Sequence, residues 1–211
     1  PDEGGVAPIH RAARDGQYDI ATELVRYSAD LDLKTNTGWT PLHLAIRSGD
    51  AEMVNLLLDF GASPHIKLPD GMPPMVYAVS MDRGDITSSF LLRAGTPDAS
   101  GNTIDVNAQD ANGNTALHFA VKNANTDATI TLLASGADPE IKNQMSESPF
   151  YLAVRNDEEV LVNVMLQNGA SVVSRTPRGA RLIDYAWDNG PETLVEIMLR
   201  HLPENARPPG S

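Results

Sequence analysis

The chain has 211 residues, of which 28 are acidic and 16 are basic, so its formal net charge is −12 at neutral pH. Apolar residues make up 41% and charged residues 21%, the composition of an ordinary globular protein rather than a disordered one. The acidic balance argues against direct binding to nucleic acid or to an anionic membrane, because both need a basic surface. The absence of cysteine excludes disulfides, thiolate metal sites and cysteine nucleophiles.

The sequence also carries no sign of a membrane or secretory destination. No apolar run approaches the roughly 18 residues of a membrane-spanning helix, and no secretory leader opens the chain. We therefore expect the protein in the cytoplasm or nucleus. Since Pro1 is not an initiator Met, we also expect the chain to be a piece of a longer protein.

One short segment recurs along the chain at a fixed period. Residues 38–45, Gly-Trp-Thr-Pro-Leu-His-Leu-Ala, return at 113–120 as Gly-Asn-Thr-Ala-Leu-His-Phe-Ala. Weaker copies give six starts, at 5, 38, 71, 113, 146 and 179, which are spaced by 33, 33, 42, 33 and 33 residues. A further glycine falls 23 residues after three of these starts, at 61, 136 and 169. Two markers in one register predict an array of six structural repeats.

Each repeat is predicted to form a turn, a short helix, a tight loop and a longer helix. In the second repeat, Thr40 and Pro41 suit a helix start. From Asp50 to Phe60, apolar residues at helical spacing mark one face of a second helix. The repeated glycine suits the end of that helix. Neither helix is long enough to be stable alone, so neighbouring pairs must stack.

Later repeats depart from this pattern. The third repeat is nine residues longer than the others, and the extra residues fall mainly at 96–104, a polar, turn-forming stretch that predicts a loop insertion. The sixth repeat has lost the Thr-Pro pair and has Asp184 at the histidine position, as expected of a degenerate terminal repeat. Residues 203–211 contain three prolines and are predicted to form a flexible tail.

The 33-residue period and the sequence Thr-Pro-Leu-His-x-Ala resemble the ankyrin repeat, over about residues 5–202. The resemblance implies an all-α ankyrin-repeat solenoid of six helix-turn-helix units, with β-hairpin fingers on one side and a curved concave surface. We accordingly assign residues 1–202 to one ankyrin-repeat domain, with the insertion at 96–104 in its third unit.

No residue pattern points to catalysis. His10, His43 and His118 occupy the same repeat position, so they cannot all be the base of one active site, and the resemblance implies structural hydrogen bonds for them. Phosphate-binding loops, nucleophile elbows, kinase motifs and zinc-helix motifs are absent from the sequence. We therefore predict no enzyme activity, no catalytic residue, no cofactor and no metal site.

The resemblance places partner contacts on the fingers and on the exposed face of each first helix. Four of the six repeats carry a basic residue nine positions after the repeat start. Trp39, Met72 and Met81 have the character of interface anchors. The predicted partner-binding residues, which we expect to face solvent, are Arg14, Trp39, Arg47, Met72, Met81, Asn114, Lys122 and Arg155.

Two alternatives to this site remain open. The basic residues are also explained as solvated helix side chains, and Trp39 as packing against neighbouring fingers. Should Trp39 prove to be packing alone, the finger carrying Arg175, Arg178 and Arg181 is the next place to search.

The predicted function is a non-enzymatic protein–protein interaction module that binds a partner peptide or domain on its concave surface. We expect a protein or peptide partner, a monomeric chain, and no nucleic acid, membrane or small-molecule substrate. One alternative is a regulatory or targeting segment of a larger enzyme or channel. Another is a domain that binds a histone tail or a transcription factor. Trp39 and Tyr77 match part of a methyl-lysine cage, whereas Leu44 and Arg47 depart from it.

Overall fold

A pair of short helices follows each of the six repeat starts. Residues 1–97 and 101–202 are described by a computed structural model, and this part of the chain contains twelve α-helices. They are α1 (Pro8–Asp15), α2 (Tyr18–Arg26), α3 (Pro41–Ser48), α4 (Ala51–Asp59), α5 (Pro74–Ser80), α6 (Gly84–Leu91), α7 (Ala116–Lys122), α8 (Thr126–Ala134), α9 (Pro149–Arg155), α10 (Glu159–Gln167), α11 (Leu182–Asn189) and α12 (Glu192–Arg200). The predicted pairing of helices in every repeat is confirmed.

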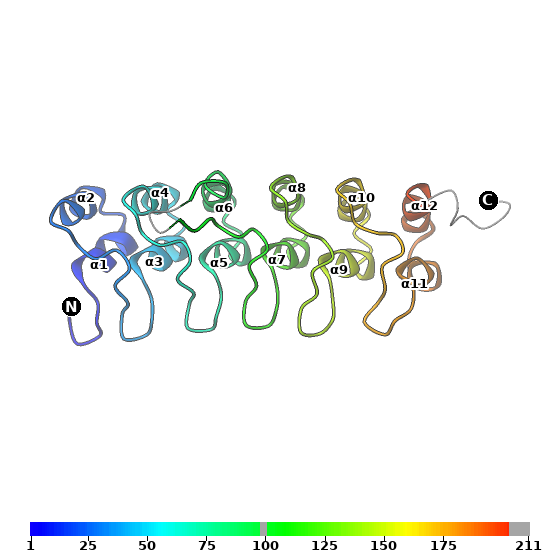
Figure 1. The fold of residues 1–211 in the computed structure, drawn as a ribbon, viewed down its shortest axis with the longest axis horizontal. Coiled ribbons are helices and arrows are strands. Elements are labelled where there is room, and N and C mark those ends of the chain that lie inside the picture. The colour runs from blue at the N-terminus through cyan, green and yellow to red at the C-terminus, as the bar shows by residue number, and fades with distance from the viewer. Residues whose placement is uncertain (98–100, 203–211) are drawn as a thin grey trace. The chain divides into compact units, whose positions relative to one another are not determined.

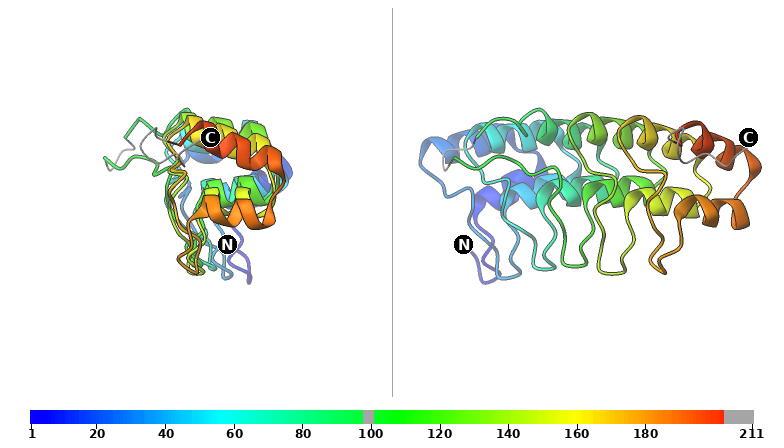
Figure 2. Two further views of the ribbon diagram at one scale, coloured as in Figure 1. Left: turned by 90° about the vertical axis from the view of Figure 1, so that its right-hand side faces the viewer. Right: turned by 45° about the vertical axis from the view of Figure 1, so that its right-hand side comes forward.

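The chain divides into two compact blocks, the first from Pro1 to Ala111 and the second from Asn112 to Ser211. In the first block, α1, α3 and α5 pack side by side in one layer, and α2, α4 and α6 form a second layer on it (Figure 1). The second block repeats this arrangement with α7, α9 and α11 in one layer and α8, α10 and α12 in the other. Within each block the long loops between pairs project to the same side of the first-helix layer (Figure 2).

The helix ends follow the predicted local chemistry. Thr40 is the N-cap of α3, with Pro41 as the first helical residue. Asp50 caps α4, where its carboxylate accepts a hydrogen bond from the Met53 backbone N–H at 2.9 Å. Gly61 lies just after the C-cap of α4 at a φ of 94°, a left-handed conformation that glycine adopts without a steric penalty.

The repeated histidines are structural, as predicted. The Thr40 backbone N–H donates to Nδ1 of His43 at 3.1 Å, so the ring proton lies on Nε2, which donates to the Ile66 carbonyl at 2.8 Å. Burial lowers the pKa of His43 from 6.5 to about 4 and keeps the ring neutral. His118 likewise bonds Thr115 and the Glu147 carbonyl. These bonds tie a first helix to the finger that follows it.

Each block has its own apolar core. Large side chains that are almost completely buried come from both helices of a pair. Those of the first block are Phe90, Leu42, Ile46, Met53, Leu57 and Ile86, and those of the second block are Phe150, Leu117, Leu132, Leu152, Leu161 and Met165. Because short helices gain little stability from their own hydrogen bonds, this shared burial holds the pairs in place.

The structure also bears on the predicted fingers, loop insertion and tail. Among the described residues the fingers are tight turns, and the isolated pair Arg175 and Arg181 makes the single β-bridge. The described residues between 93 and 115 contain neither helix nor strand, in keeping with a loop insertion, while residues 98–100 of that loop lie outside the described part. The predicted flexible tail at 203–211 also lies outside it.

No helix in the described ranges is long and apolar enough to cross a membrane.

Candidate functional site

Trp39 is the centre of an aromatic group in the first block. It lies in the finger before α3 and is half-buried, whereas the sequence led us to expect a side chain facing solvent. Its ring meets Tyr77 of α5 edge-on, with centroids 5.8 Å apart and an interplanar angle of 83°. A second edge-on contact, at 6.1 Å, is made with His43. Trp39 therefore contributes to packing between neighbouring repeats, as edge-to-face aromatic pairs do.

Arg47 lies over the ring of this tryptophan. Its guanidinium carbon lies 4.8 Å from the Trp39 ring centroid, and the side chain is exposed at the end of α3. No carboxylate lies within ion-pair distance of Arg47 in the described part of the chain. The guanidinium is thus held in place by the aromatic face while its charge stays available.

The neighbourhood of Tyr77 is positively charged. Arg83 donates from Nη2 to the Arg47 carbonyl oxygen at 3.3 Å, so a second guanidinium lies beside the end of α3. Burial raises the pKa of Tyr77, while the charges of Arg47 and Arg83 oppose that rise and Asp70 adds to it. Arg47 and Arg83 therefore form a small positively charged area on a chain whose net charge is −12.

The two predicted methionine anchors lie on or beside α5. The Ser80 hydroxyl contacts the sulfur of Met72 at 3.7 Å, which places that half-buried side chain against the helix. Met81 follows α5 directly and is 40% exposed. Arg14 of α1 is also exposed, yet its guanidinium is paired with Asp15 at 2.7 Å and 2.9 Å. That hydrogen bond lowers the pKa of Asp15.

The predicted site residues of the second block are arranged differently. Lys122 lies over the Phe119 ring at 5.4 Å, and Arg155 lies over Tyr151 at 5.5 Å. Arg155 also forms an ion pair with Glu147, which neutralises it locally. Tyr151 in turn contacts Tyr185 of α11, with centroids 6.1 Å apart.

Asn114 does not lie on the surface. It is 5% exposed, and its Oδ1 accepts a hydrogen bond from the Asn143 side-chain amide at 3.0 Å. The expectation that it faces solvent is wrong, because this buried amide pair joins one finger to the next. A polar side chain in one finger can form its hydrogen bonds with the neighbouring finger instead of with water.

Sequence reasoning did not include three aromatic residues among the partner-binding positions. Tyr77, Phe119 and Tyr185 each lie six residues after their repeat start, so the register itself could have identified them. Of the three, Phe119 lies under Lys122, while Tyr77 contacts Trp39 and Tyr185 contacts Tyr151.

The geometry does not favour a methyl-lysine cage. A methylammonium would have to lie over the Trp39 ring, where the like-charged guanidinium of Arg47 already lies 4.8 Å from the centroid. Leu44, at the position of a possible further cage wall, is 7% exposed. Among the described residues, moreover, no group of three or more His, Asp or Glu side chains could hold a metal ion.

Stacked pairs of short helices, with a buried Thr-His link from helix to finger, define the architecture of an ankyrin-repeat protein. The family described as "Ankyrin repeats (3 copies)" matches residues 2–68, 60–143 and 91–176. The chain therefore belongs to the ankyrin-repeat family. Repeats of this family mediate protein–protein interaction, which is the general class of function they bring.

Similar proteins include much longer ones. The human Neurogenic locus notch homolog protein 1 is 33% identical over 160 residues, 72% of this chain and 6% of that protein. The mouse B-cell lymphoma 3 protein homolog is 30% identical over 110 residues, 52% of this chain and 25% of that protein. The chain thus spans a quarter or less of the length of these relatives.

Solved structures show the same fold. The ankyrin repeat domain of Bcl-3, described as a unique member of the IkappaB protein family, matches with a TM-score of 0.83 and 28% identity. That match covers 94% of this chain and 87% of the Bcl-3 chain. An ankyrin repeat domain from Acinetobacter baumannii matches with a TM-score of 0.82, over 92% of this chain and 97% of its own. At 20% identity, this second likeness concerns the fold alone.

Proposed function

We propose that the chain is a non-enzymatic recognition module that binds a partner peptide or protein domain through its fingers and the exposed faces of its first helices. The binding energy is concentrated in the first block, on Trp39, Arg47, Met72 and Met81. Lys122 and Arg155 are the candidate contacts of the second block, where Arg155 is paired with Glu147. Arg14 of the first block is engaged by Asp15. The partner segment pairs an apolar residue with one or two carboxylates.

The observation that carries this proposal is the position of Arg47 over Trp39. A guanidinium fixed on an aromatic face presents directed N–H donors at little entropic cost, and no carboxylate of the described chain neutralises it. The half-exposed Met81 provides adaptable apolar surface on the next repeat. Aromatic and arginine anchors of this kind dominate interface energies. The surrounding net negative charge disfavours competitors that are more acidic.

The test compares ligand capture by two immobilised variants from one native lysate. Arg47→Glu with Met81→Ala alters the proposed surface, and Arg26→Glu is the matched control, since Arg26 lies exposed on α2 in the other helix layer. A ligand retained by wild type and by the control but lost by the double variant is then purified. Its affinity for the double variant should fall by about 2 kcal/mol or more, roughly 30-fold. Identical ligand sets for both variants would contradict the proposal.

We propose further that the module works as part of a larger protein. The relatives it matches are many times longer, so a regulatory or targeting role beside another domain is the favoured context. A cytoplasmic or nuclear location fits a cysteine-free chain of this composition. Sequencing of the flanking regions tests both statements, because a catalytic, channel or secretory segment there would be recognisable.

A further inference from the structure

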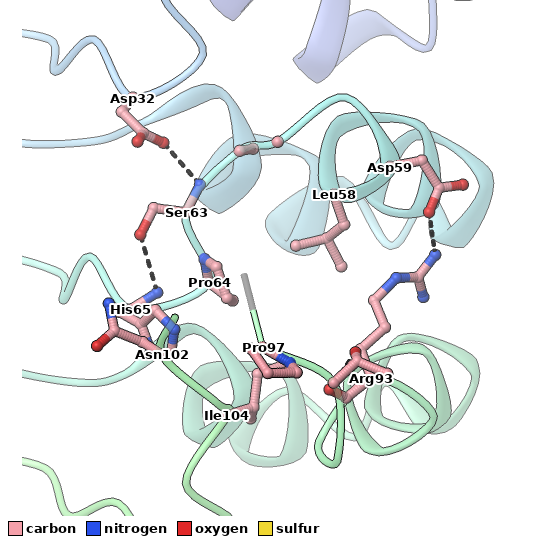
Figure 3. A pocket seen from close by; sticks show the side chains of 13 residues that line it. Asp32, Leu58, Asp59, Ser63, Pro64, His65, Arg93, Pro97, Asn102 and Ile104 are labelled. Atoms are coloured by element: carbon pink, nitrogen blue, oxygen red, sulfur yellow. Dashed lines mark hydrogen bonds and ion pairs between the residues drawn. The ribbon is translucent and has the colours of Figure 1, made fainter. Parts of the chain in front are cut away.

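A second candidate surface lies in the first block, where Thr96, Pro97, Asn102 and Ile104 of the insertion lie opposite the second repeat. A cavity of about 500 Å³ opens there (Figure 3). One wall is the end of α4 and the loop 61–65, and the other is formed by Arg93, Thr96, Pro97, Asn102 and Ile104. A neighbouring cavity of about 390 Å³ is lined by 28–32 and Phe60. Asp32 and Gly61 line both cavities, so the two adjoin, and we call them together the insertion groove.

The insertion groove carries unbalanced negative charge. Asp32 accepts a hydrogen bond from the Ser63 backbone N–H at 2.8 Å, and Asp30 accepts one from the Asp32 N–H at 2.9 Å. Neither carboxylate has a cation within ion-pair distance among the described residues. Bonds to backbone N–H groups fix both side chains in position without neutralising them.

The one arginine of the groove is already engaged. Arg93 pairs with Asp59 at 2.6 Å and donates through Nη1 to the Asn55 side chain and the Ser89 carbonyl, both at 2.9 Å. Its guanidinium points toward Asp59 and away from Asp32, and its charge is offset by Asp59 (Figure 3). Arg26, on the nearby helix α2, is likewise paired with Glu23. The net charge left for a ligand is negative.

Apolar surface accompanies these carboxylates. Phe60, the C-cap residue of α4, lines the groove and is 47% exposed, and Tyr27, the C-cap residue of α2, is 80% exposed. The equivalent C-cap residues of α8 and α10 are polar, Ser135 and Asn168. The first block thus combines two exposed aromatic side chains, Tyr27 and Phe60, with the insertion residues that line the groove. The repeat fold alone does not require this combination.

We propose that the insertion groove binds an extended segment of a partner protein in which a lysine or arginine stands next to an apolar residue. The cation lies against Asp30 and Asp32, and the apolar side chain rests on Phe60 and Ile104. This site shares no residue with the Trp39 surface, and its ligand has the opposite charge. The chain therefore presents two surfaces that select different segments.

The test uses a phage-displayed library of random peptides selected on the immobilised full chain, followed by anisotropy titration of the enriched peptides as labelled synthetic probes. Enriched peptides of one class should carry a basic residue beside an apolar one. Asp32→Asn keeps an oxygen for the Ser63 N–H but removes the charge, so it should weaken these peptides about tenfold. Phe60→Ala should weaken them as well, and added salt should reduce the difference between wild type and Asp32→Asn.

Two controls separate this site from the rest of the molecule. Asp127→Asn removes an exposed carboxylate of α8 outside the groove and should leave binding unchanged. Arg47→Glu alters only the Trp39 surface and should also leave it unchanged, so this proposal and the proposed function can fail separately. Asp30→Asn, at an exposed position, repeats the charge test should Asp32→Asn melt early.

Three results would overturn the proposal. The first is a selection that yields no peptide of the basic–apolar class. The second is equal affinity of such peptides for wild type, Asp32→Asn and Asp30→Asn. The third is loss of their binding on Arg47→Glu, which would assign them to the Trp39 surface instead.

Discussion

The two blocks share a repeat register but differ in what they leave available on their surfaces. In the first block, Arg47 stands over Trp39 without a carboxylate partner, and exposed aromatic residues follow α2 and α4. In the second block, Arg155 stands over Tyr151 in the same way but is paired with Glu147. A common backbone therefore carries an arginine without a carboxylate partner in the first block, and an arginine at the same repeat position that is paired with a carboxylate in the second.

The comparison shows that a repeat position does not define a function by itself. Arg47 and Arg155 both lie nine residues after a repeat start, and both lie over an aromatic ring. The finger residue decides the difference, since Trp39 in one block corresponds to Glu147 in the other. A carboxylate at that position offsets the charge that a tryptophan leaves exposed.

The largest effect on folding stability is expected from truncating a buried side chain in one core at a time. Phe90 and Phe150 are completely buried, one in each block, so Phe90→Ala or Phe150→Ala should cost about 3–5 kcal/mol. Hydrogen exchange should report the loss first in the block that carries the change, because repeat stability depends on nearest neighbours. Equal loss of protection in α4 and α10 from either variant would remove the distinction between the blocks.

A pH experiment probes the Thr-His link of the first block. His43 has a pKa of about 4 in the folded chain, below its ordinary 6.5, because its neutral ring is buried. Between these values the unfolded chain binds more protons, so stability is fully present above about pH 6.5 and declines as the pH falls toward 4. The loss from this residue approaches about 3 kcal/mol.

Urea unfolding of wild type and His43→Gln at several pH values measures this contribution. The variant starts less stable at neutral pH, since it loses the bonds to Thr40 and Ile66, but its stability should decline less on acidification. Parallel pH curves for the two proteins would contradict the assignment of a neutral, buried His43.

Trp39→Ala distinguishes packing from binding in the first block. Loss of the edge-on contact with Tyr77 should cost about 1 kcal/mol of folding free energy. Loss of the anchor should cost about 2 kcal/mol or more of partner binding. Thermal melting and calorimetric titration with a captured ligand give the two values. A folding loss without a binding loss would make Trp39 a packing residue, and the Arg175 finger would become the next candidate.

The smallest effect is expected from making the second block resemble the first. Glu147→Gln removes the carboxylate paired with Arg155 but keeps the backbone carbonyl that His118 uses. Because the pair lies near the surface, stability should change by less than about 1 kcal/mol. The freed Arg155 should bind acidic, apolar peptides more tightly in anisotropy titrations. Arg155→Gln in the same background should cancel that gain.

The repeats, the twelve helices, the N-cap of α3 and the structural role of the histidines could be predicted from the residues alone. These features depend on residues close together in the chain, so a 33-residue period and a few capping side chains were sufficient to predict them. The candidate surface was partly predictable for the same reason, since the register places Arg47 and Arg155 on exposed helix faces.

Which of those side chains remain available depends on contacts between repeats. Trp39 meets Tyr77 from the next repeat, and Asn114 is buried against Asn143. Pro97 and Ile104 of the insertion line one cavity with Asp32 and Gly61. Each of these contacts joins residues about thirty or more positions apart, and its geometry depends on how neighbouring helix pairs stack. Periodicity predicts the face on which a side chain lies, whereas the neighbour that covers or neutralises it is fixed by packing in three dimensions.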